Sequence, residues 1–165
     1  MATIHGGWRE PLPPILQGAQ LLLSERKIAT DVPVPLHGQV DQVFLARGWL
    51  ILVDTKRRKQ ARVYTKDVIQ LSVYATILAR QAGAFAGQNY PVANTAFVRC
   101  VTPNGTTYIE VCLLSTREII ALWNRYWMLR RDGLAARPTC PPSPVCAGCS
   151  KKAQCPRGKR LGNSA

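Results

Sequence analysis

Two apolar stretches decide the fold, Gly38-Gln39-Val40-Asp41-Gln42-Val43-Phe44-Leu45 and Trp49-Leu50-Ile51-Leu52-Val53-Asp54-Thr55-Lys56. Both are rich in β-branched and aromatic residues, and the short Gly-containing link Ala46-Arg47-Gly48 joins them. The pattern predicts a hairpin of two strands, 36–45 and 49–56. With the turn centred between Arg47 and Gly48, Asp41 stands directly opposite Asp54.

Strand alternation places Lys56 on the same face as the two carboxylates. The other face is predicted to hold the apolar residues Val40, Phe44, Ile51 and Val53. Acidic residues on strands are usually solvated, but the apolar flanks of this hairpin argue against a solvated face. Facing carboxylates repel unless a cation or a shared proton intervenes, and oxygen ligands suit Mg²⁺ or Mn²⁺. The sequence therefore predicts a divalent metal site at Asp41 and Asp54, with Lys56 beside the attacking water.

The rest of the chain predicts a mixed α/β or α+β domain. We expect a short helix over 15–23, an extended segment over 27–34 and a buried helix over 65–82. Residues 95–101 and 106–114 flank Pro103-Asn104-Gly105, which predicts a second hairpin. A last helix is expected from Ser115 or Thr116 to Arg131, capped by Ser115-Thr116-Arg117-Glu118. Its residues Trp123, Tyr126 and Trp127 are spaced as one core stripe.

The composition favours a nucleic-acid partner. Lysine and arginine number 22 against 9 acidic residues, a net charge of +13, as expected of a protein that faces a polyanion. A basic membrane-surface or ribosomal protein would share this charge. The sequence has neither an export signal nor about 18 consecutive apolar residues, so we expect a cytoplasmic protein without a membrane span.

Three motifs resemble those of the RecB-like PD-(D/E)XK nucleases: Gly38-x-x-Asp41, Asp54-Thr55-Lys56 after an apolar run, and Gln70-x-x-x-Tyr74. The resemblance implies a restriction-endonuclease-like core, a central mixed sheet flanked by helices. It further implies that Asp41, Asp54 and the Thr55 carbonyl bind the metal, that Lys56 is catalytic, and that Gln70 and Tyr74 organise the site and the DNA. Independently of the family, Gln70 and Tyr74 share one helix face.

The first motif of that family is commonly a His or a Glu near the N-terminus, and three residues are candidates for it. His5 is favoured because its spacing from Asp41 suits the His-type members and because neutral imidazole binds metals. Glu25 and His37 remain alternatives.

The C-terminal end carries four closely spaced cysteines, Cys140, Cys146, Cys149 and Cys155. Four thiolates at this spacing predict one metal ion or cluster. The resemblance favours a [4Fe–4S] cluster, with zinc as the alternative. Cys100 and Cys112 lie in apolar strands and are expected to be core residues. We therefore divide the chain into a nuclease domain, 1–135, and a Cys-rich tail, 136–165, packed on it.

A basic run follows the predicted catalytic lysine, and Arg57, Arg58, Lys59 and Arg62 are expected to contact DNA phosphates. The sequence thus predicts a Mg²⁺- or Mn²⁺-dependent DNA exonuclease acting at single-stranded ends, as in CRISPR adaptation or DNA repair, with an integrase or helicase as possible partner. The alternatives are a catalytically inactive DNA-binding scaffold subunit and a zinc-ribbon DNA-binding regulator.

Overall fold

The computed structural model describes residues 10–86, 88–133, 148–150 and 153, without the side chains of 82–86. These residues fall into two compact units, one ending at Ile120 and one beginning at Ala121. The elements in chain order are η1 (Pro14–Leu16), β1 (Gln20–Thr30), β2 (Leu36–Ala46), β3 (Trp49–Arg57), α1 (Thr65–Ala86), β4 (Thr95–Thr102), β5 (Gly105–Cys112) and α2 (Thr116–Asp132).

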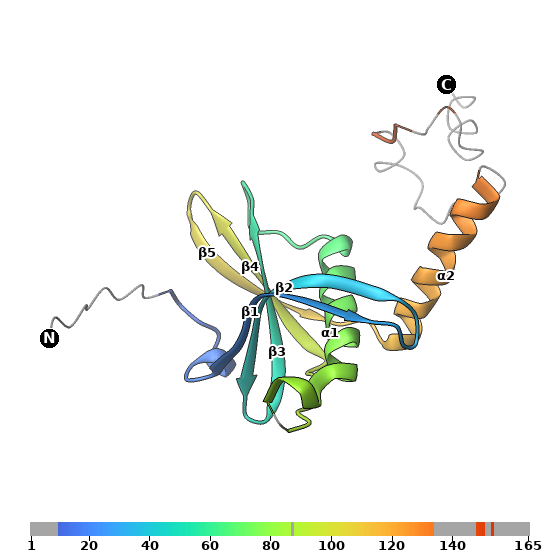
Figure 1. The fold of residues 1–165 in the computed structure, drawn as a ribbon. Helices are drawn as coiled ribbons and strands as arrows, with labels where there is room; N and C mark the ends of the chain where they lie inside the picture. The colour runs from blue at the N-terminus through green and yellow to red at the C-terminus, as the bar shows by residue number, and fades with distance from the viewer. Residues whose placement is uncertain (1–9, 87, 134–147, 151–152, 154–165) are drawn as a thin grey trace, which may run out of the picture. The chain divides into compact units, whose positions relative to one another are not determined.

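The strands form one mixed sheet in the order β1-β2-β3-β4-β5 (Figure 1). Strands β3 and β4 are parallel and all other neighbours are antiparallel. A parallel pair needs a crossover connection, and here α1 supplies it between β3 and β4. The α/β class with a central mixed sheet and helices, predicted from the sequence, is confirmed.

Helix α1 packs on one face of this sheet. Its residues Leu71, Tyr74, Ile77 and Leu78 share a buried cluster with sheet residues such as Leu52. A second, smaller cluster covers the opposite face and consists of Leu16, Ala46, Ile51, Val53 and Phe97. Burial of each large apolar side chain is worth about 1.5–3 kcal/mol, so α1 is held firmly against β3. The helix can therefore present polar side chains to that strand in fixed positions.

The first hairpin has the expected register. Its ladder pairs Phe44 with Ile51 and Gln42 with Val53, so Asp41 and Asp54 come next along the two strands. The expected place of Val40 is wrong: Val40 and Val43 both belong to the cluster beneath α1, whereas Val53 lies on the opposite face. Residues three apart cannot share a face of a regular strand, so β2 departs from strict alternation between Val40 and Val43.

Three other sequence expectations are wrong. The helix expected over 15–23 is a 3₁₀ turn, Pro14–Leu16, and β1 already begins at Gln20, because Gly18 at φ 75° redirects the chain and the apolar residues after it pair with β2. Cys112 is exposed, unlike the fully buried Cys100. Tyr126 and Trp127 are about half exposed, 51% and 49%, and so are not core residues.

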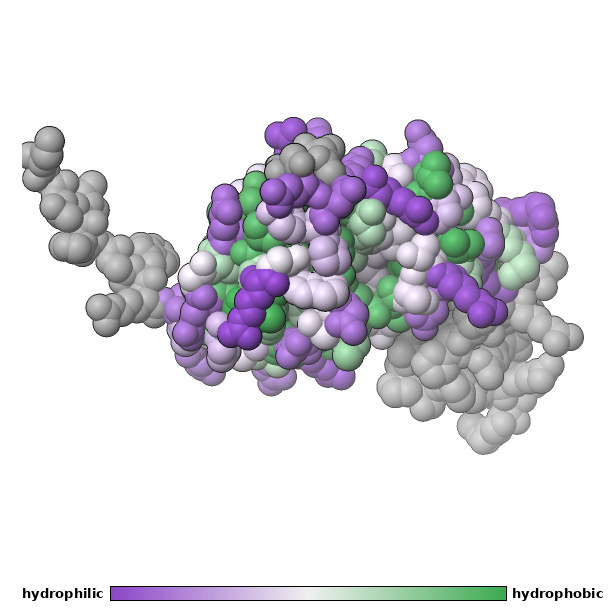
Figure 2. All heavy atoms as spheres, turned by 90° about the horizontal axis from the view of Figure 1, so that it is seen from below, coloured by the Kyte–Doolittle hydropathy of each residue, from purple (hydrophilic) through white to green (hydrophobic). Residues whose placement is uncertain are grey.

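The remaining elements agree with the sequence. The second hairpin and α2 lie where predicted. Ser115 caps α2 reciprocally, because its backbone N donates to Glu118 Oε2 at 2.7 Å while the Glu118 backbone N donates to Ser115 Oγ at 3.3 Å. None of the helices in the described residues is long and apolar enough to cross a membrane. Figure 2 shows one face of the molecule, where hydrophilic residues are spread between smaller apolar areas.

Candidate active site at the end of strand β3

Asp41 reaches across to β3 where the ladder between β2 and β3 ends. The last pair of that ladder is Gln42 with Val53, and beyond it the backbone N of Thr55 donates to Asp41 Oδ2 at 2.7 Å. A hydrogen bond to a carboxylate is stronger than one to a neutral acceptor. Asp41 therefore takes the place of a ladder bond and is fixed next to Asp54.

Asp54, Lys56 and Gln70 form a closed set of contacts beneath α1. Lys56 Nζ lies 2.7 Å from Asp54 Oδ2 and donates to Gln70 Oε1 at 3.0 Å. Gln70 Nε2 in turn donates to Asp54 Oδ1 at 3.2 Å. Alternation along β3 places Asp54 and Lys56 on the face of α1, where the helix brings Gln70 over them. One strand and one helix thus deliver all three groups.

Tyr74 extends this set of contacts by one helical turn. Gln70 Nε2 also donates to the Tyr74 hydroxyl at 2.8 Å, and Tyr74 is only 8% exposed. The ring lies against Gly38 so closely that a Cβ there would overlap it. The glycine in Gly38-x-x-Asp41 is therefore explained by the space that Tyr74 occupies.

Burial dominates the electrostatics of Asp54, which is 1% exposed. Desolvation raises the pKa of this carboxyl, Lys56 offsets part of the rise, and the neighbouring charges of Asp41 and Asp67 add to it. The ionised form of Asp54 is therefore destabilised unless further positive charge lies close to the carboxylate.

The oxygen atoms of this site fit a hard divalent cation. Asp54 Oδ2 is buried and, despite the short contact with Lys56 Nζ, accepts no well-directed hydrogen bond from the described residues. Such an atom fits the first coordination shell of Mg²⁺ or Mn²⁺, which prefer oxygen ligands and retain several waters. Within the part of the chain that the structure describes, no three His, Cys, Asp or Glu residues converge. The described groups that could hold such a cation are thus the carboxylates of Asp41 and Asp54.

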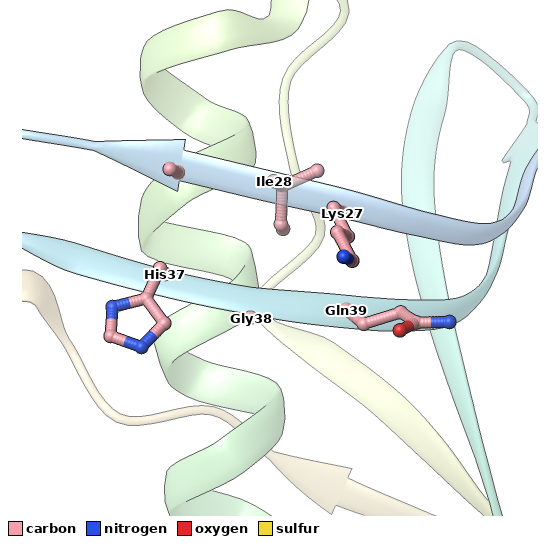
Figure 3. Close-up of a pocket in the computed structure, with 6 residues that line it drawn as sticks. Lys27, Ile28, His37, Gly38 and Gln39 are labelled. Atoms are coloured by element: carbon pink, nitrogen blue, oxygen red, sulfur yellow. The ribbon is translucent and has the colours of Figure 1, made fainter.

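Neither Glu25 nor His37 joins these carboxylates. Glu25 Oε2 accepts a hydrogen bond from Gln39 Nε2 at 3.0 Å. His37 lines a cavity of about 450 Å³ on β1 and β2, together with Lys27 and Gln39 (Figure 3). Because Gly38 touches Tyr74, its neighbour His37 points to the other face of the sheet. His5, the favoured residue for the first motif, lies outside the described residues.

The basic run after Lys56 is not uniform. Arg57, Lys59 and Arg62 are exposed. Arg58, by contrast, is paired with the buried Asp67, to which its Nη2 donates at 2.7 and 2.8 Å. From the sequence Arg58 is expected to contact DNA, and its pairing with Asp67 is not predicted. The available signal in the sequence is that a basic residue directly after a strand, Arg58, is followed by an acidic residue in the first turn of the next helix, Asp67.

A second ion pair, which sequence reasoning missed, lies on the sheet face opposite α1. Glu10 accepts from Arg99 Nε at 2.9 Å and from the Tyr108 hydroxyl at 3.3 Å. The three residues line a cavity of about 320 Å³ together with Gln42 and Phe44. Nothing in the local sequence links Glu10 to Arg99, because the two are far apart along the chain.

The cysteine site predicted for the C-terminal end falls almost entirely outside the described residues. Of its four cysteines only Cys149 is described, and it is exposed. Cys140, Cys146 and Cys155 lie outside the described part of the chain.

Comparisons with known proteins bear on the family and on the fold. The family model of the PD-(D/E)XK nuclease superfamily matches residues 8–156. Among the solved structures that resemble the chain, the crystal structure of SSO0001 superposes with a TM-score of 0.51 at 17% sequence identity, a likeness of fold. The match covers 87% of this chain and 64% of that one. No curated protein sequence matches significantly. Because the family model spans most of the sequence, the chain belongs to the PD-(D/E)XK nuclease superfamily.

Proposed function

We propose that this protein is a Mg²⁺- or Mn²⁺-dependent DNA exonuclease that acts at single-stranded ends. The observation that carries the proposal is the convergence of Asp41, Asp54 and Lys56 beneath α1, with Gln70 joining the last two. Membership of a nuclease superfamily supports the hydrolytic chemistry. The high net charge of +13 supports a polyanionic substrate.

In the proposed mechanism two carboxylates and a backbone carbonyl bind the cation, and a lysine assists the attacking water. Asp41 and Asp54 would hold the cation, and the Thr55 carbonyl is proposed as a further ligand. When bound, the cation polarises the scissile phosphate and lowers the pKa of the attacking water. Lys56 places its ammonium beside that water and offsets negative charge on the phosphate during attack. The water oxygen bonds to phosphorus as the phosphorus–oxygen bond to the leaving nucleotide breaks, and the departing oxygen ends protonated.

Gln70 and Tyr74 act through the other groups. The amide of Gln70 restrains both Lys56 and Asp54, and the buried Tyr74 hydroxyl fixes the amide. Such supporting contacts hold reacting groups in place at the moment of attack. His5 is proposed as a third ligand of the cation, in keeping with its spacing from Asp41.

The test is cleavage of end-labelled single-stranded oligonucleotides with Mn²⁺, comparing wild type with Lys56→Ala. Lys27→Ala is the matched control, because Lys27 is an exposed lysine that lines the cavity on β1 and β2. We expect cleavage by wild type and by the control, its loss in Lys56→Ala, and no cleavage of a circular single strand. Metal-dependent cutting of the circle would contradict the requirement for an end.

The alternative is a catalytically inactive DNA-binding scaffold subunit. It predicts that wild type binds the oligonucleotide but cleaves it no faster than Lys56→Ala at any metal concentration.

We further propose that Cys140, Cys146, Cys149 and Cys155 bind a [4Fe–4S] cluster in a tail, 136–165, that follows a nuclease domain, 1–135. The supporting observation is their spacing in a Pro- and Gly-rich segment. Broad visible absorption of anaerobically purified protein would support the cluster, and a colourless zinc-containing protein would contradict it.

We also propose that the protein acts in the cytoplasm, in CRISPR adaptation or DNA repair, with an integrase or helicase as partner protein.

A further inference from the structure

The connection between β3 and α1, residues 58–64, is held by hydrogen bonds at both ends. At its start, the Arg58 backbone N donates to the Val101 carbonyl on β4 at 3.0 Å, and the Arg58 guanidinium bonds the Asp67 carboxylate and the Arg62 carbonyl. At its end, the Tyr64 backbone N donates to Asp67 Oδ2 at 2.8 Å. Asp67 is 1% exposed. This buried carboxylate therefore holds residues 58–64 in one shape.

The pinned connection presents an aromatic ring to solvent. Tyr64 is 45% exposed, in contrast to Tyr74 at 8%. The Arg58 guanidinium carbon lies 4.7 Å from the centre of the Tyr64 ring and that of Arg62 lies 5.3 Å away. Guanidinium groups at this range interact favourably with the ring. Arg58 is held by Asp67, whereas Arg62 is exposed to solvent.

The exposed charged residues that neighbour this ring along the chain are all basic, whereas Asp67 is buried. Between Lys56 and Lys66 the sequence contains no acidic residue. The exposed cations in this stretch are Arg57, Lys59, Arg62 and Lys66. An exposed aromatic ring among cations is the combination that binds single-stranded nucleic acid, since bases stack on the ring while the cations meet the phosphates.

We propose that Tyr64 is a base-stacking platform for single-stranded DNA, with Lys59 and Arg62 contacting the adjoining phosphates. The proposal rests on the proposed function, because it places the platform near the reacting groups. From Thr65 to Gln70 the helix rises only about 7.5 Å, at 1.5 Å per residue. A strand stacked on Tyr64 therefore passes within a few nucleotides of Lys56, which contacts Gln70.

This arrangement selects single strands over duplex. In a duplex each base is already stacked and paired, so its flat face is closed to a protein side chain. A single strand exposes that face at no cost in pairing. The basic residues alone would bind both forms, because they recognise phosphate. The aromatic ring is thus the part of this surface that distinguishes the two.

Binding without cleavage tests the platform. We would measure fluorescence anisotropy of a labelled single strand and a labelled duplex in EDTA, with wild type and Tyr64→Ala, Tyr64→Leu and Tyr64→Phe. The matched control is Trp49→Ala, which removes a 49% exposed aromatic at the other end of β3. We expect Tyr64→Ala and Tyr64→Leu to weaken single-strand binding about 10-fold, the usual effect of one stacked base. Tyr64→Phe and Trp49→Ala should bind as wild type does.

A second readout reports stacking itself. Wild type should quench the emission of a single strand that carries 2-aminopurine, and Tyr64→Leu, which retains apolar bulk, should not. If Tyr64→Ala fails to fold, judged by its thermal melt, the Leu variant decides. Unchanged single-strand binding in Tyr64→Leu, or an equal loss of duplex binding, would overturn the platform. If wild type quenches the probe in EDTA yet cleaves nothing with Mn²⁺, the platform stands and the hydrolytic function fails.

Discussion

Gln70 faces Asp54 and Lys56 at once: its Nε2 donates to Asp54 Oδ1 at 3.2 Å, and its Oε1 accepts from Lys56 Nζ at 3.0 Å. Only this orientation of the amide satisfies both neighbours, because a carboxylate accepts and an ammonium donates. The Tyr74 hydroxyl shares the Nε2 donor at 2.8 Å. One helix residue thus hydrogen-bonds both charged groups of β3.

Removal of the Gln70 amide should slow cleavage more than it weakens DNA binding. In Gln70→Ala, Lys56 and Asp54 both lose the amide that bonds them, and their positions are less restrained. We therefore expect kcat to fall about 10- to 100-fold, as for other supporting contacts at metal sites. Steady-state kinetics with Mn²⁺ should show a change in kcat with little change in KM. The control is Gln60→Ala, an exposed glutamine in the connection after β3. Equal rates for both variants would contradict the role given to Gln70.

Gly38 should tolerate no side chain while Tyr74 stays in place. In Gly38→Ala the new Cβ would overlap Cε1 of the Tyr74 ring and lie only 3.1 Å from its Cδ1. Such overpacking costs about 1–3 kcal/mol of unfolding free energy. Urea denaturation of wild type, Gly38→Ala, Tyr74→Leu and the double variant measures it. The smaller Leu side chain should absorb most of the cost of Gly38→Ala, whereas additive effects would show that the two residues do not interact.

The Arg58–Asp67 pair should stabilise the fold above acidic pH. Burial opposes ionisation of Asp67, yet hydrogen bonds from Arg58 and the Tyr64 backbone outweigh it and hold its pKa below the usual value. The stabilisation is therefore fully present above the pKa of the unfolded chain, about 3.9 for Asp, and is lost as the pH falls through the lower folded value. Asp67→Asn should reduce the unfolding free energy by about 3 kcal/mol at neutral pH, since it breaks a buried pair. Urea denaturation should show that the difference in unfolding free energy between wild type and Asp67→Asn becomes smaller below about pH 4. The same difference at neutral and at acidic pH would disprove this role of the pair.

Mn²⁺ should stabilise the folded protein through Asp54. A ligand that binds only the folded state adds about 2.7 kcal/mol when present at 100 times its Kd. Thermal melts of wild type should shift upward with Mn²⁺, and those of Asp54→Asn should not. Asp31→Asn, a change of an exposed aspartate in the turn before β2, serves as control. An equal upward shift in Asp54→Asn would mean that the cation binds elsewhere.

The sequence was sufficient for the parts of the site that repeat at short range. Period-two alternation and the Ala46-Arg47-Gly48 turn predicted the register of the first hairpin, and the ladder confirms it as far as Gln42 and Val53. The four-residue spacing of Gln70 and Tyr74 predicted one helix face, and the two side chains are hydrogen-bonded. These features depend on neighbours along the chain or across one turn, so periodicity carries them.

Other features could not be predicted from the sequence, because residues far apart in the chain determine them. The apolar residues after Gly18 suit a short helix by local pattern, but pairing with β2 makes them a strand. The pairing of Arg58 with Asp67 is likewise set by distant structure, because α1 brings Asp67 beside the guanidinium. The break in alternation between Val40 and Val43 likewise has no local signature in the sequence, since it follows from the burial of both residues in the cluster beneath α1.

Helix α1 connects the parallel strands β3 and β4, so the residues of the site come before β4 and β5 in the chain, and this order bears on how the site folds. Everything proposed to bind the cation or assist attack, apart from His5, lies between Gly38 and Tyr74, in one hairpin and the start of the following helix. Such a stretch needs little closure of distant loops and can assemble early in folding. Strands β4 and β5 then complete the sheet around it. Insertions after α1 should therefore alter the lifetime of the folded protein more than they alter its chemistry.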